Sequence, residues 1–358
     1  MMRYSAAKGL LVSLLCTLLT TTYAQSPAEV KALIKEGVAL YDAGKYDEAV
    51  LRYRQALKLA PDDFTAQYEL ALTYGSLGRP EEVVEMSKKL LLNEARADAN
   101  VYVIYGTALD DLKKPREAVR IYQAGLKKFP DQGLLYYNLG VTQAGLQQYE
   151  EAIVSLQQAV RKNPGHASAH RVLGALTAAG GNRVPAVLEY LRFLQLEPLT
   201  ERSAPNLALL DKLLARGVTP TSDSSVTISL DRDVLKQMNS RKSKPDNFGQ
   251  ADMLLSMKGA KDKALLSKGQ LPTERLIEKL GTLLESLAEQ KPATRPGFAW
   301  EYYVPYFIDL QRAGYLPTLA YLVQASRTAQ PEVPQWLEQH SREVKELREW
   351  SKAYAWPK

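Results

Sequence analysis

Histidine and cysteine, the side chains that most often bind metals or act as nucleophiles, are scarce in this chain. Its 358 residues include three histidines and one cysteine. His166 and His170 are four residues apart, a spacing that can hold a metal ion on one side of a helix. However, His166 is predicted to lie in a turn, no carboxylate follows closely, and zinc sites generally use about three or four protein ligands. The sequence therefore predicts no metal site.

The paired carboxylates of the chain have a structural explanation. Glu81-Glu82 and Glu150-Glu151 are predicted to begin helices, where negative charge interacts favourably with the helix dipole. Gly180-Gly181 is neither preceded by a strand nor followed by the lysine and hydroxyl of a phosphate-binding loop. The chain also lacks the Gly-x-Ser-x-Gly motif of serine hydrolases. We therefore expect a non-enzymatic protein without catalytic residues or cofactors.

The composition is typical of a globular protein that does not bind nucleic acid. Hydrophobic residues make up 46% of the chain, and 46 Lys and Arg stand against 40 Asp and Glu, a net charge of +6. Removing the first 24 residues, which contain Arg3 and Lys8, would lower the charge to +4 (6 − 2). No basic block marks a nucleic-acid surface.

Residues 1–24 have the pattern of an export signal. Arg3 and Lys8 precede an apolar run at residues 9–19, and Ala24 is the small residue that signal peptidase favours. The run is shorter than the roughly 20 apolar residues of a membrane span, although an uncleaved anchor is the alternative. Cys16 lies within the signal, so the mature chain would contain no cysteine. We expect cleavage after Ala24 and export to the periplasm or exterior, with no membrane span in the mature chain.

The rest of the first half repeats with a constant period. Small or apolar residues recur at intervals of 34, 35, 34 and 34 residues: Ala49, Val83, Ala118, Ala152 and Ala186. A second small position precedes each of them: Gly37, Ala71, Gly106, Gly140 and Gly174. A proline closes four of the five blocks: Pro61, Pro130, Pro164 and Pro198. The spacing predicts two antiparallel helices per block.

These five blocks resemble tetratricopeptide repeats, and the resemblance covers about half of the chain. It implies an all-α fold, an α-solenoid of about five helix-turn-helix repeats followed by a mostly helical C-terminal domain. We expect repeats at residues 25–200, a capping helix at 201–217, a linker at 218–225 and the C-terminal domain at 226–358. Gly44 and Gly78 suit a left-handed turn between helices, whereas Lys113 and Gln147 occupy that place under strain or in another geometry.

The resemblance implies that the first helix of each repeat lines a concave groove that binds a peptide or protein segment. The family's familiar carboxylate clamp is not expected, because Ile34 and Val38 stand where its lysine and asparagine would be. The predicted groove is instead apolar and aromatic, suited to an extended or helical segment. Its residues are Ile34, Val38, Tyr41, Tyr68, Leu72, Val103, Tyr137, Val141 and Arg171. The alternative is that the C-terminal half of the chain fills the groove.

The C-terminal domain has no period but a marked aromatic segment at residues 298–307. Its Trp300-Glu301-Tyr302-Tyr303, with Trp350-Ser351-Lys352, resembles the tail of exported bacterial repeat proteins of undefined role. These aromatic residues are expected in the core. The alternative is an aromatic platform of Trp300, Tyr302, Tyr303 and Trp350 for a glycan or peptide, carried by the repeats as an arm. Pro305 is expected to kink or restart its helix, and Val226 to Ile228 to form a strand with no obvious partner.

Overall fold

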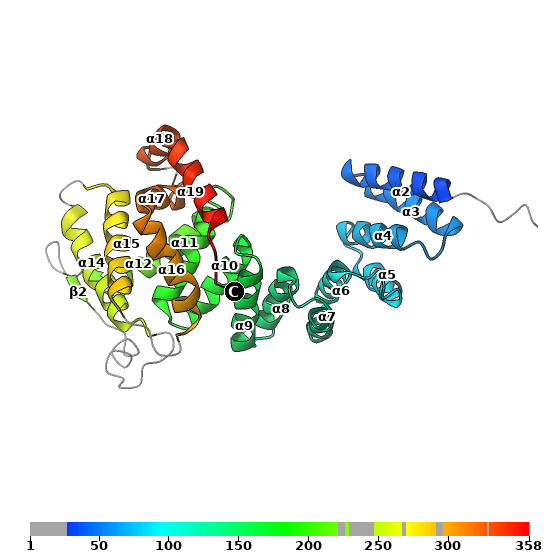
Figure 1. The fold of residues 1–358 in the computed structure, drawn as a ribbon, viewed down its shortest axis with the longest axis horizontal. Helices are drawn as coiled ribbons and strands as arrows, with labels where there is room; N and C mark the ends of the chain where they lie inside the picture. Colours follow the sequence, from blue (N-terminus) through cyan, green and yellow to red (C-terminus); the bar gives the residue numbers. More distant parts are fainter. Residues whose placement is uncertain are drawn as a thin grey trace, which may run out of the picture. The chain divides into compact units, whose positions relative to one another are not determined.

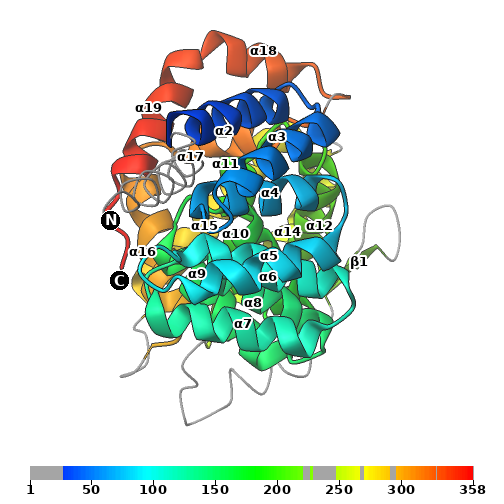
Figure 2. The ribbon, with the colours of Figure 1, turned by 90° about the vertical axis from the view of Figure 1, so that its right-hand side faces the viewer.

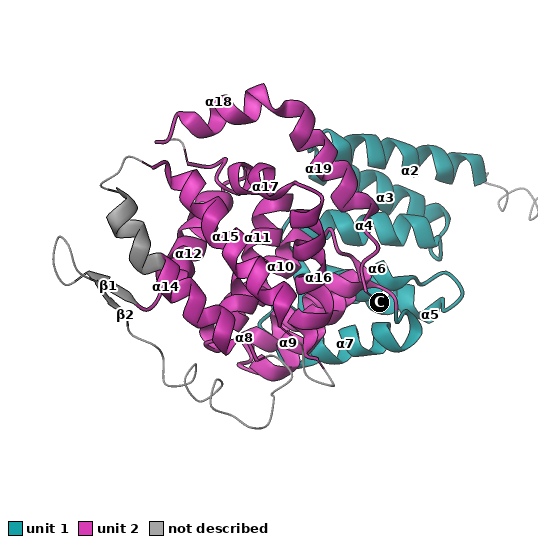
Figure 3. Ribbon diagram, turned by 60° about the vertical axis from the view of Figure 1, so that its left-hand side comes forward, with its two compact units in different colours: residues 1–130 teal, residues 131–358 magenta. Residues whose placement is uncertain are grey.

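The computed structural model describes residues 27–220, 226–228, 247–266, 270–290, 296–327 and 329–357 (Figure 1). The predicted signal at residues 1–24 lies outside these ranges. Within them, no helix has the length and apolar character that a membrane crossing requires. The chain forms two compact units, residues 1–130 and 131–358, so the boundary falls inside the repeats (Figure 3).

Unit 1 contains three helical pairs that follow one another along the chain (Figure 2). The pairs are α2 (Pro27–Asp42) with α3 (Tyr46–Leu59), α4 (Phe64–Ser76) with α5 (Pro80–Leu92), and α6 (Ala99–Asp111) with α7 (Pro115–Lys128). Local sequence starts these helices: Asp63 and Asp98 accept hydrogen bonds from backbone N–H groups of the first turn. Pro80 and Pro115 occupy first-turn positions, where no N–H is needed.

The turns inside the repeats confirm the prediction of left-handed backbone. Gly44 and Gly78 have φ of 73° and 66°. Lys113 and Gln147 adopt the same geometry, with φ of 59° and 62°. Because a Cβ is disfavoured there, these two turns are strained, as expected, while keeping the same shape.

In the first and third repeats, a tyrosine of the second helix packs closely against a glycine of the first. A Cβ on Gly37 would lie 2.4 Å from Cε1 of Tyr53, and one on Gly106 would lie 2.2 Å from Cε1 of Tyr122. Both tyrosines are buried, and so are the alanines that define the period. The small residues are therefore required by the close approach of an aromatic ring.

Unit 2 continues with two more pairs and then the C-terminal helices. The pairs are α8 (Gly133–Gly145) with α9 (Tyr149–Lys162) and α10 (Ala167–Ala179) with α11 (Arg183–Leu196). The other helices are α12 (Ser203–Ala215), α14 (Gly249–Leu266), α15 (Pro272–Glu289), α16 (Phe298–Arg312), α17 (Leu316–Val323), α18 (Glu332–Gln339) and α19 (Ser341–Ala353). The predicted all-α fold is confirmed, with one two-stranded ribbon added to it.

The ribbon and α16 differ from the sequence-based expectation. Strand β2 (Val226–Ile228) pairs antiparallel with β1 (Val218–Pro220), part of the segment predicted to be a linker. The predicted strand therefore does have a partner upstream, in a register that pairs Thr219 with Thr227. Helix α16 runs through Pro305 as one element, so of the two expected alternatives the restart is wrong, and the kink stays a prediction.

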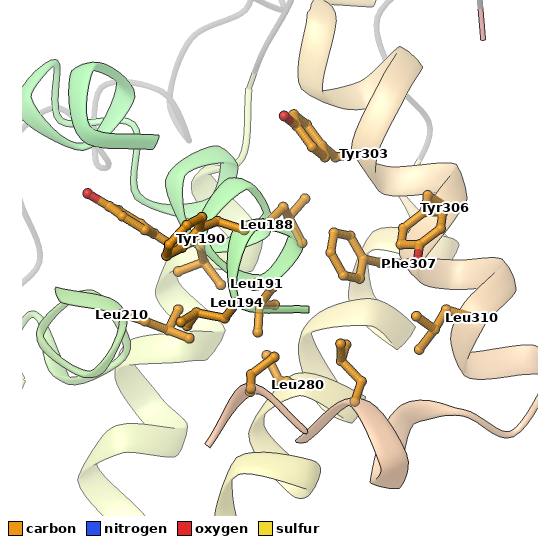
Figure 4. Close-up of a cluster of buried hydrophobic side chains, with 14 of the residues drawn as sticks. Leu188, Tyr190, Leu191, Leu194, Leu210, Leu280, Tyr303, Tyr306, Phe307 and Leu310 are labelled. Carbon is orange, nitrogen blue, oxygen red and sulfur yellow. The ribbon is translucent and has the colours of Figure 1, made fainter. Parts of the chain in front are cut away.

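Helix α11 is the centre of unit 2. Thirteen of its 14 residues are buried, which is typical of a helix with neighbours on all sides. It contacts α10 and α12 of the repeat region and α14, α16 and α17 of the C-terminal region. Figure 4 shows Leu188, Leu191 and Leu194 of α11 in one cluster with Phe307 and Leu310 of α16. The last repeat and the C-terminal helices therefore share one hydrophobic core.

Candidate functional site

The predicted groove residues of unit 1 lie on the first helices of its repeats. Ile34, Val38 and Tyr41 are on α2, Tyr68 and Leu72 on α4, and Val103 on α6. All six side chains are partly buried, so each presents some surface while packing on a neighbour. The helical spacing predicted from the sequence thus places them on half-exposed faces, as a lined groove requires.

A pocket of about 210 Å³ lies between α4 and α6, beside the start of α5. Two predicted groove residues, Leu72 and Val103, line it. Apolar neighbours complete most of the wall: Ala71, Pro80, Val83, Ile104 and Ala108, with Gly75, Gly78, Thr107, Arg79 and Asp111. The pocket therefore joins successive repeats and has a mainly apolar interior.

Arg79 and Asp111 are pocket residues that the sequence analysis did not select. Arg79 forms an ion pair with Glu82 and its guanidinium lies 4.8 Å from the centre of the Tyr74 ring. It is therefore engaged within its own repeat. Asp111 is exposed and is the last residue of α6. Its place at the end of α6, the helix that carries the predicted groove residue Val103, is the signal that could have identified it.

The remaining groove tyrosines of unit 1 are held in place by their neighbours. The Tyr41 hydroxyl is 2.9 Å from the Ser76 hydroxyl, which links α2 to α4. The Tyr68 ring stacks on Phe64, with 6.4 Å between ring centroids. Burial, with a smaller contribution from Asp98, raises the pKa of Tyr68, so its hydroxyl stays protonated near neutral pH. Both side chains are therefore held in place by contacts within unit 1.

The predicted groove residues of unit 2 differ from one another in their contacts and exposure. The Tyr137 ring lies 4.4 Å from the His166 ring, Val141 is 39% exposed and Arg171 is partly buried. The C-terminal helices α14, α16 and α17 contact α11, the second helix of its pair, and leave Leu134 and Val141 of α8 exposed. Within unit 2, the C-terminal helices therefore pack on α11 and also reach α10, the first helix of the same pair, where the Tyr303 hydroxyl bonds His170.

The alternative aromatic platform is contradicted by burial. Trp300, Tyr302 and Tyr303 are 7%, 0% and 0% exposed. The Tyr302 hydroxyl donates to the backbone oxygen of Val160 at 2.7 Å, and Trp350 is partly buried against Tyr306. These rings fasten the C-terminal helices to the repeats, so their faces are not open to a glycan. Trp300, Tyr302 and Tyr303 lie in the core, and Trp350 packs against it.

The two histidines of the fifth repeat have structural roles. His166 precedes α10, and its Nδ1 accepts a hydrogen bond from the backbone N–H of Ala169. His170 is fully buried; its Nε2 donates to the backbone oxygen of Pro164 at 3.0 Å and its Nδ1 accepts from the Tyr303 hydroxyl at 2.7 Å. Burial, and then the charge of Arg192, lowers the pKa of His170 to about 3. Among the described residues, no cluster of three or more potential ligands could hold a metal ion.

Two buried arginines of α11 carry the polar part of the unit 2 core. Arg192 donates to the Tyr306 and Ser351 hydroxyls at 3.1 and 2.6 Å, and its guanidinium lies 5.1 Å from the Tyr306 ring centre. Arg183 donates to the Asp252 carboxylate at 2.7 Å and to the backbone oxygen of Leu213. Burial lowers the pKa of both guanidiniums from a very high ordinary value. These contacts tie α11 to α14, α16 and α19, and are structural and not catalytic in geometry.

The helical pairs and their lined groove are those of a repeat α-solenoid, and comparison with known proteins names the repeat. The family model "TPR repeat" matches residues 37–78, and "Tetratricopeptide repeat" matches residues 106–167 and 144–198. These segments are tetratricopeptide repeats, which generally mediate protein–protein interactions and are generally not catalytic.

The curated relatives and the solved structure named below each align with about half of the chain. The chain is 25% identical over 187 residues to anaphase-promoting complex subunit 7 of Homo sapiens, covering 51% of the chain and 32% of that protein. It is 30% identical over 184 residues to the Homo sapiens protein O-mannosyl-transferase TMTC1, covering 50% of the chain and 21% of that protein. The structure of PilF from Pseudomonas aeruginosa aligns with a TM-score of 0.47 and 23% identity, covering 52% of this chain and 84% of PilF. The chain thus spans about a third or less of the two curated relatives.

Proposed function

We propose that this chain is a non-enzymatic scaffold that binds a segment of a partner protein in the groove of its first repeats. The observation that carries the proposal is the apolar pocket between α4 and α6, lined by Leu72 and Val103. Its volume of about 210 Å³ is available without rearrangement of the helices. A cavity of about 150 Å³ with apolar walls is enough to bind benzene, so this pocket has room for one aliphatic side chain.

The residues around the pocket favour an internal segment over a chain terminus. A terminal carboxylate would need cationic partners, but Tyr68 and Leu72 occupy the positions of the clamp residues in the second repeat. Arg79, the pocket's only arginine or lysine, is already paired with Glu82. The bound segment is therefore recognised through an apolar anchor, with tyrosine hydroxyls able to hydrogen-bond its backbone.

Peptide selection on the purified full chain tests this proposal. We expect dodecapeptides selected from a random phage-displayed library to contain a Leu, Ile, Val or Met anchor. The substitution Val103→Trp fills the pocket, so it should weaken binding of a selected, fluorescently labelled peptide by about tenfold or more, as loss of one buried aliphatic side chain implies. Fluorescence anisotropy measures the affinity.

The matched control is Leu51→Trp, which adds the same ring at an exposed position of α3. It should bind the selected peptide as tightly as the unmodified chain. Circular dichroism establishes that both variants remain helical. Equal binding of all selected peptides by Val103→Trp and Leu51→Trp would show that the pocket is not the site.

Export to the cell envelope or exterior is part of the same proposal. It is supported by the basic, apolar and small-residue pattern of residues 1–24. N-terminal sequencing of the protein recovered from its native cells should begin at Gln25. A recovered protein that retains Arg3 and Lys8 in the cytoplasmic fraction would contradict export.

A further inference from the structure

A pocket of about 270 Å³ in unit 2 is lined by charged side chains from three segments that are far apart in the sequence. Arg275 and Lys279 lie on α15, and Arg327 follows the end of α17. Asp211 of α12 is the acidic residue of the wall. Among the described residues that line the pocket, three are thus cationic and one is acidic, a formal charge of +2 (3 − 1). Such a wall attracts an anion and repels a metal ion.

The ion pair between Arg327 and Asp211 uses only part of the guanidinium. Nη2 of Arg327 donates to both carboxylate oxygens of Asp211, at 2.6 and 2.5 Å. Nε of Arg327 is buried and has no hydrogen-bond partner in the described part of the chain. A buried N–H without a partner is costly and requires an explanation. An acceptor group that reaches Arg327 from the pocket would supply one.

Arg275 and Lys279 can act on the same ligand as Arg327. They are four residues apart on α15, a spacing that places side chains about 5 to 6 Å apart on one side of a helix. Both line the pocket, and Lys279 is only 8% exposed. Both also interact with other groups of the chain, but a guanidinium and an ammonium each carry several N–H donors. Contacts within the chain and a ligand in the pocket are therefore compatible.

We propose that this pocket binds a small dianion whose phosphate or carboxylate oxygens are held by Arg275, Lys279 and Arg327. A dianion neutralises the formal charge of +2 on the wall, and the planar guanidinium matches the geometry of both groups. Pockets for drug-sized ligands have volumes of about 300 to 1,000 Å³, so about 270 Å³ favours a small anion. The site lies in unit 2 and is independent of the groove proposed in unit 1.

The walls of the pocket are fixed by contacts within unit 2. Gln324, another lining residue, is buried, and its Nε2 donates to Oγ1 of Thr273 at 3.0 Å. This bond joins the end of α17 to the first turn of α15. Leu214 and Leu276, which also line the pocket, belong to the hydrophobic core. The cations are thus carried by helices that are already packed together, and such preorganisation lowers the cost of binding.

Isothermal titration calorimetry on the purified full chain tests the charge of the ligand. The probes are inorganic phosphate, succinate with two carboxylates, and acetate with one. We expect phosphate or succinate to bind, and acetate to bind at least about tenfold more weakly, because one carboxylate leaves half of the wall charge without a partner. Binding of phosphate alone would assign the site to a phosphate group, and binding of succinate alone would assign it to a dicarboxylate.

Substitution of the cations tests the place of binding. Arg275→Gln with Lys279→Gln should weaken binding of the dianion by about tenfold or more. The matched control is Arg342→Gln with Lys352→Gln, which removes the same charge at exposed positions of α19 and should bind as the unmodified chain does. Circular dichroism establishes that both double variants are folded.

Three results would overturn the proposal: no binding of either dianion, equal binding of acetate and the dianions, or equal binding of the dianion by the two double variants. If the substitutions at Arg275 and Lys279 prevent folding, the comparison of acetate with the dianions on the unmodified chain still decides.

Discussion

Helices α3 and α11 hold the same place in their repeats but have very different surroundings. Helix α3 buries four of its 14 residues, Ala49, Val50, Tyr53 and Ala56, along one stripe. Helix α11 buries 13 of its 14, including Arg183, Glu189 and Arg192. The repeat motif is common to both, so the difference arises from the neighbours: α14, α16 and α17 pack on α11.

This comparison separates two uses of one motif. In unit 1 the repeats keep half-exposed faces, and the pocket beside Leu72 and Val103 is part of them. In unit 2 the last repeat is a central element of a larger core that reaches Leu347 of α19. Unit 1 is therefore the part in which we propose that a segment binds, while the repeats of unit 2 also hold the C-terminal helices.

The largest expected effect is a loss of stability of the unit 2 core. The substitution Asp252→Ala removes the carboxylate that pairs with the buried Arg183. The Arg183 side chain is 1% exposed, so an uncompensated buried charge remains. Removing one partner of a buried pair costs about 3 to 5 kcal/mol, and the bonds of Arg183 to Leu213 and Leu214 favour the lower value. The four tryptophans, Trp300, Trp336, Trp350 and Trp356, all lie in unit 2, so their fluorescence during urea unfolding reports this loss.

The exposed pair Glu85–Lys89 of unit 1 is the matched control. Its side chains are 65% and 49% exposed, and such pairs contribute about 0 to 1 kcal/mol. Glu85→Ala should leave the tryptophan-detected transition unchanged. A small effect of Asp252→Ala would mean that the core around α11 is less closed than its burial indicates.

The second prediction compares alanine at the small-residue position of the third and fifth repeats. In unit 1, Gly106→Ala places a Cβ 2.2 Å from Cε1 of Tyr122, and such overpacking costs about 1 to 3 kcal/mol. In unit 2, Gly174→Ala meets Tyr190 and Glu189 only at 3.4 Å, and the helical gain of about 0.5 to 1 kcal/mol should remain. Amide hydrogen exchange in α6 and in α10 measures each change locally. Similar losses at both positions would show that the repeats are equally packed.

The third prediction concerns acid. The pKa of His170 falls to about 3 in the folded chain, from an ordinary value of 6.5. Between these values the unfolded chain binds a proton that the folded chain does not, so stability is lost as pH falls below about 6.5, by about 1.4 kcal/mol per pH unit. Urea unfolding followed by tryptophan fluorescence at a series of pH values should show this slope.

The slope should be smaller in His170→Gln, which removes the titrating ring, even if that variant is less stable at every pH. His340→Gln keeps His170 and serves as the control with the unmodified slope. An unchanged slope in His170→Gln would show that other groups of unit 2 cause its sensitivity to acid.

The repeats could be predicted from the sequence because their determinants are local and recur. The period fixed by Ala49 and its successors specifies two helices per block, and the groove stripe follows from helical spacing. Leu72 and Val103 were predicted for the same reason, and both line the pocket. The backbone geometry at Lys113 could also be predicted, because the first two repeats have Gly44 and Gly78 at that position.

The other features depend on contacts between distant parts of the chain. The bond between His170 and Tyr303 spans 133 residues, and the partner of Arg183 is 69 residues away. No local sequence pattern reports such distant pairs. The sequence alone therefore left open whether the aromatic segment at residues 298–307 is buried or forms an exposed platform.

The division after Pro130 has a mechanical consequence. Repeats that contact only their neighbours can open one at a time, so pulling on unit 1 should release the chain in steps. A block of 34 residues yields roughly 100 Å of extended chain. In unit 2 the core around α11 joins the last repeat to helices as far as α19. We therefore expect unit 2 to unfold in one step that releases a greater length of chain. Under tension, the groove would be lost first and the C-terminal helices last.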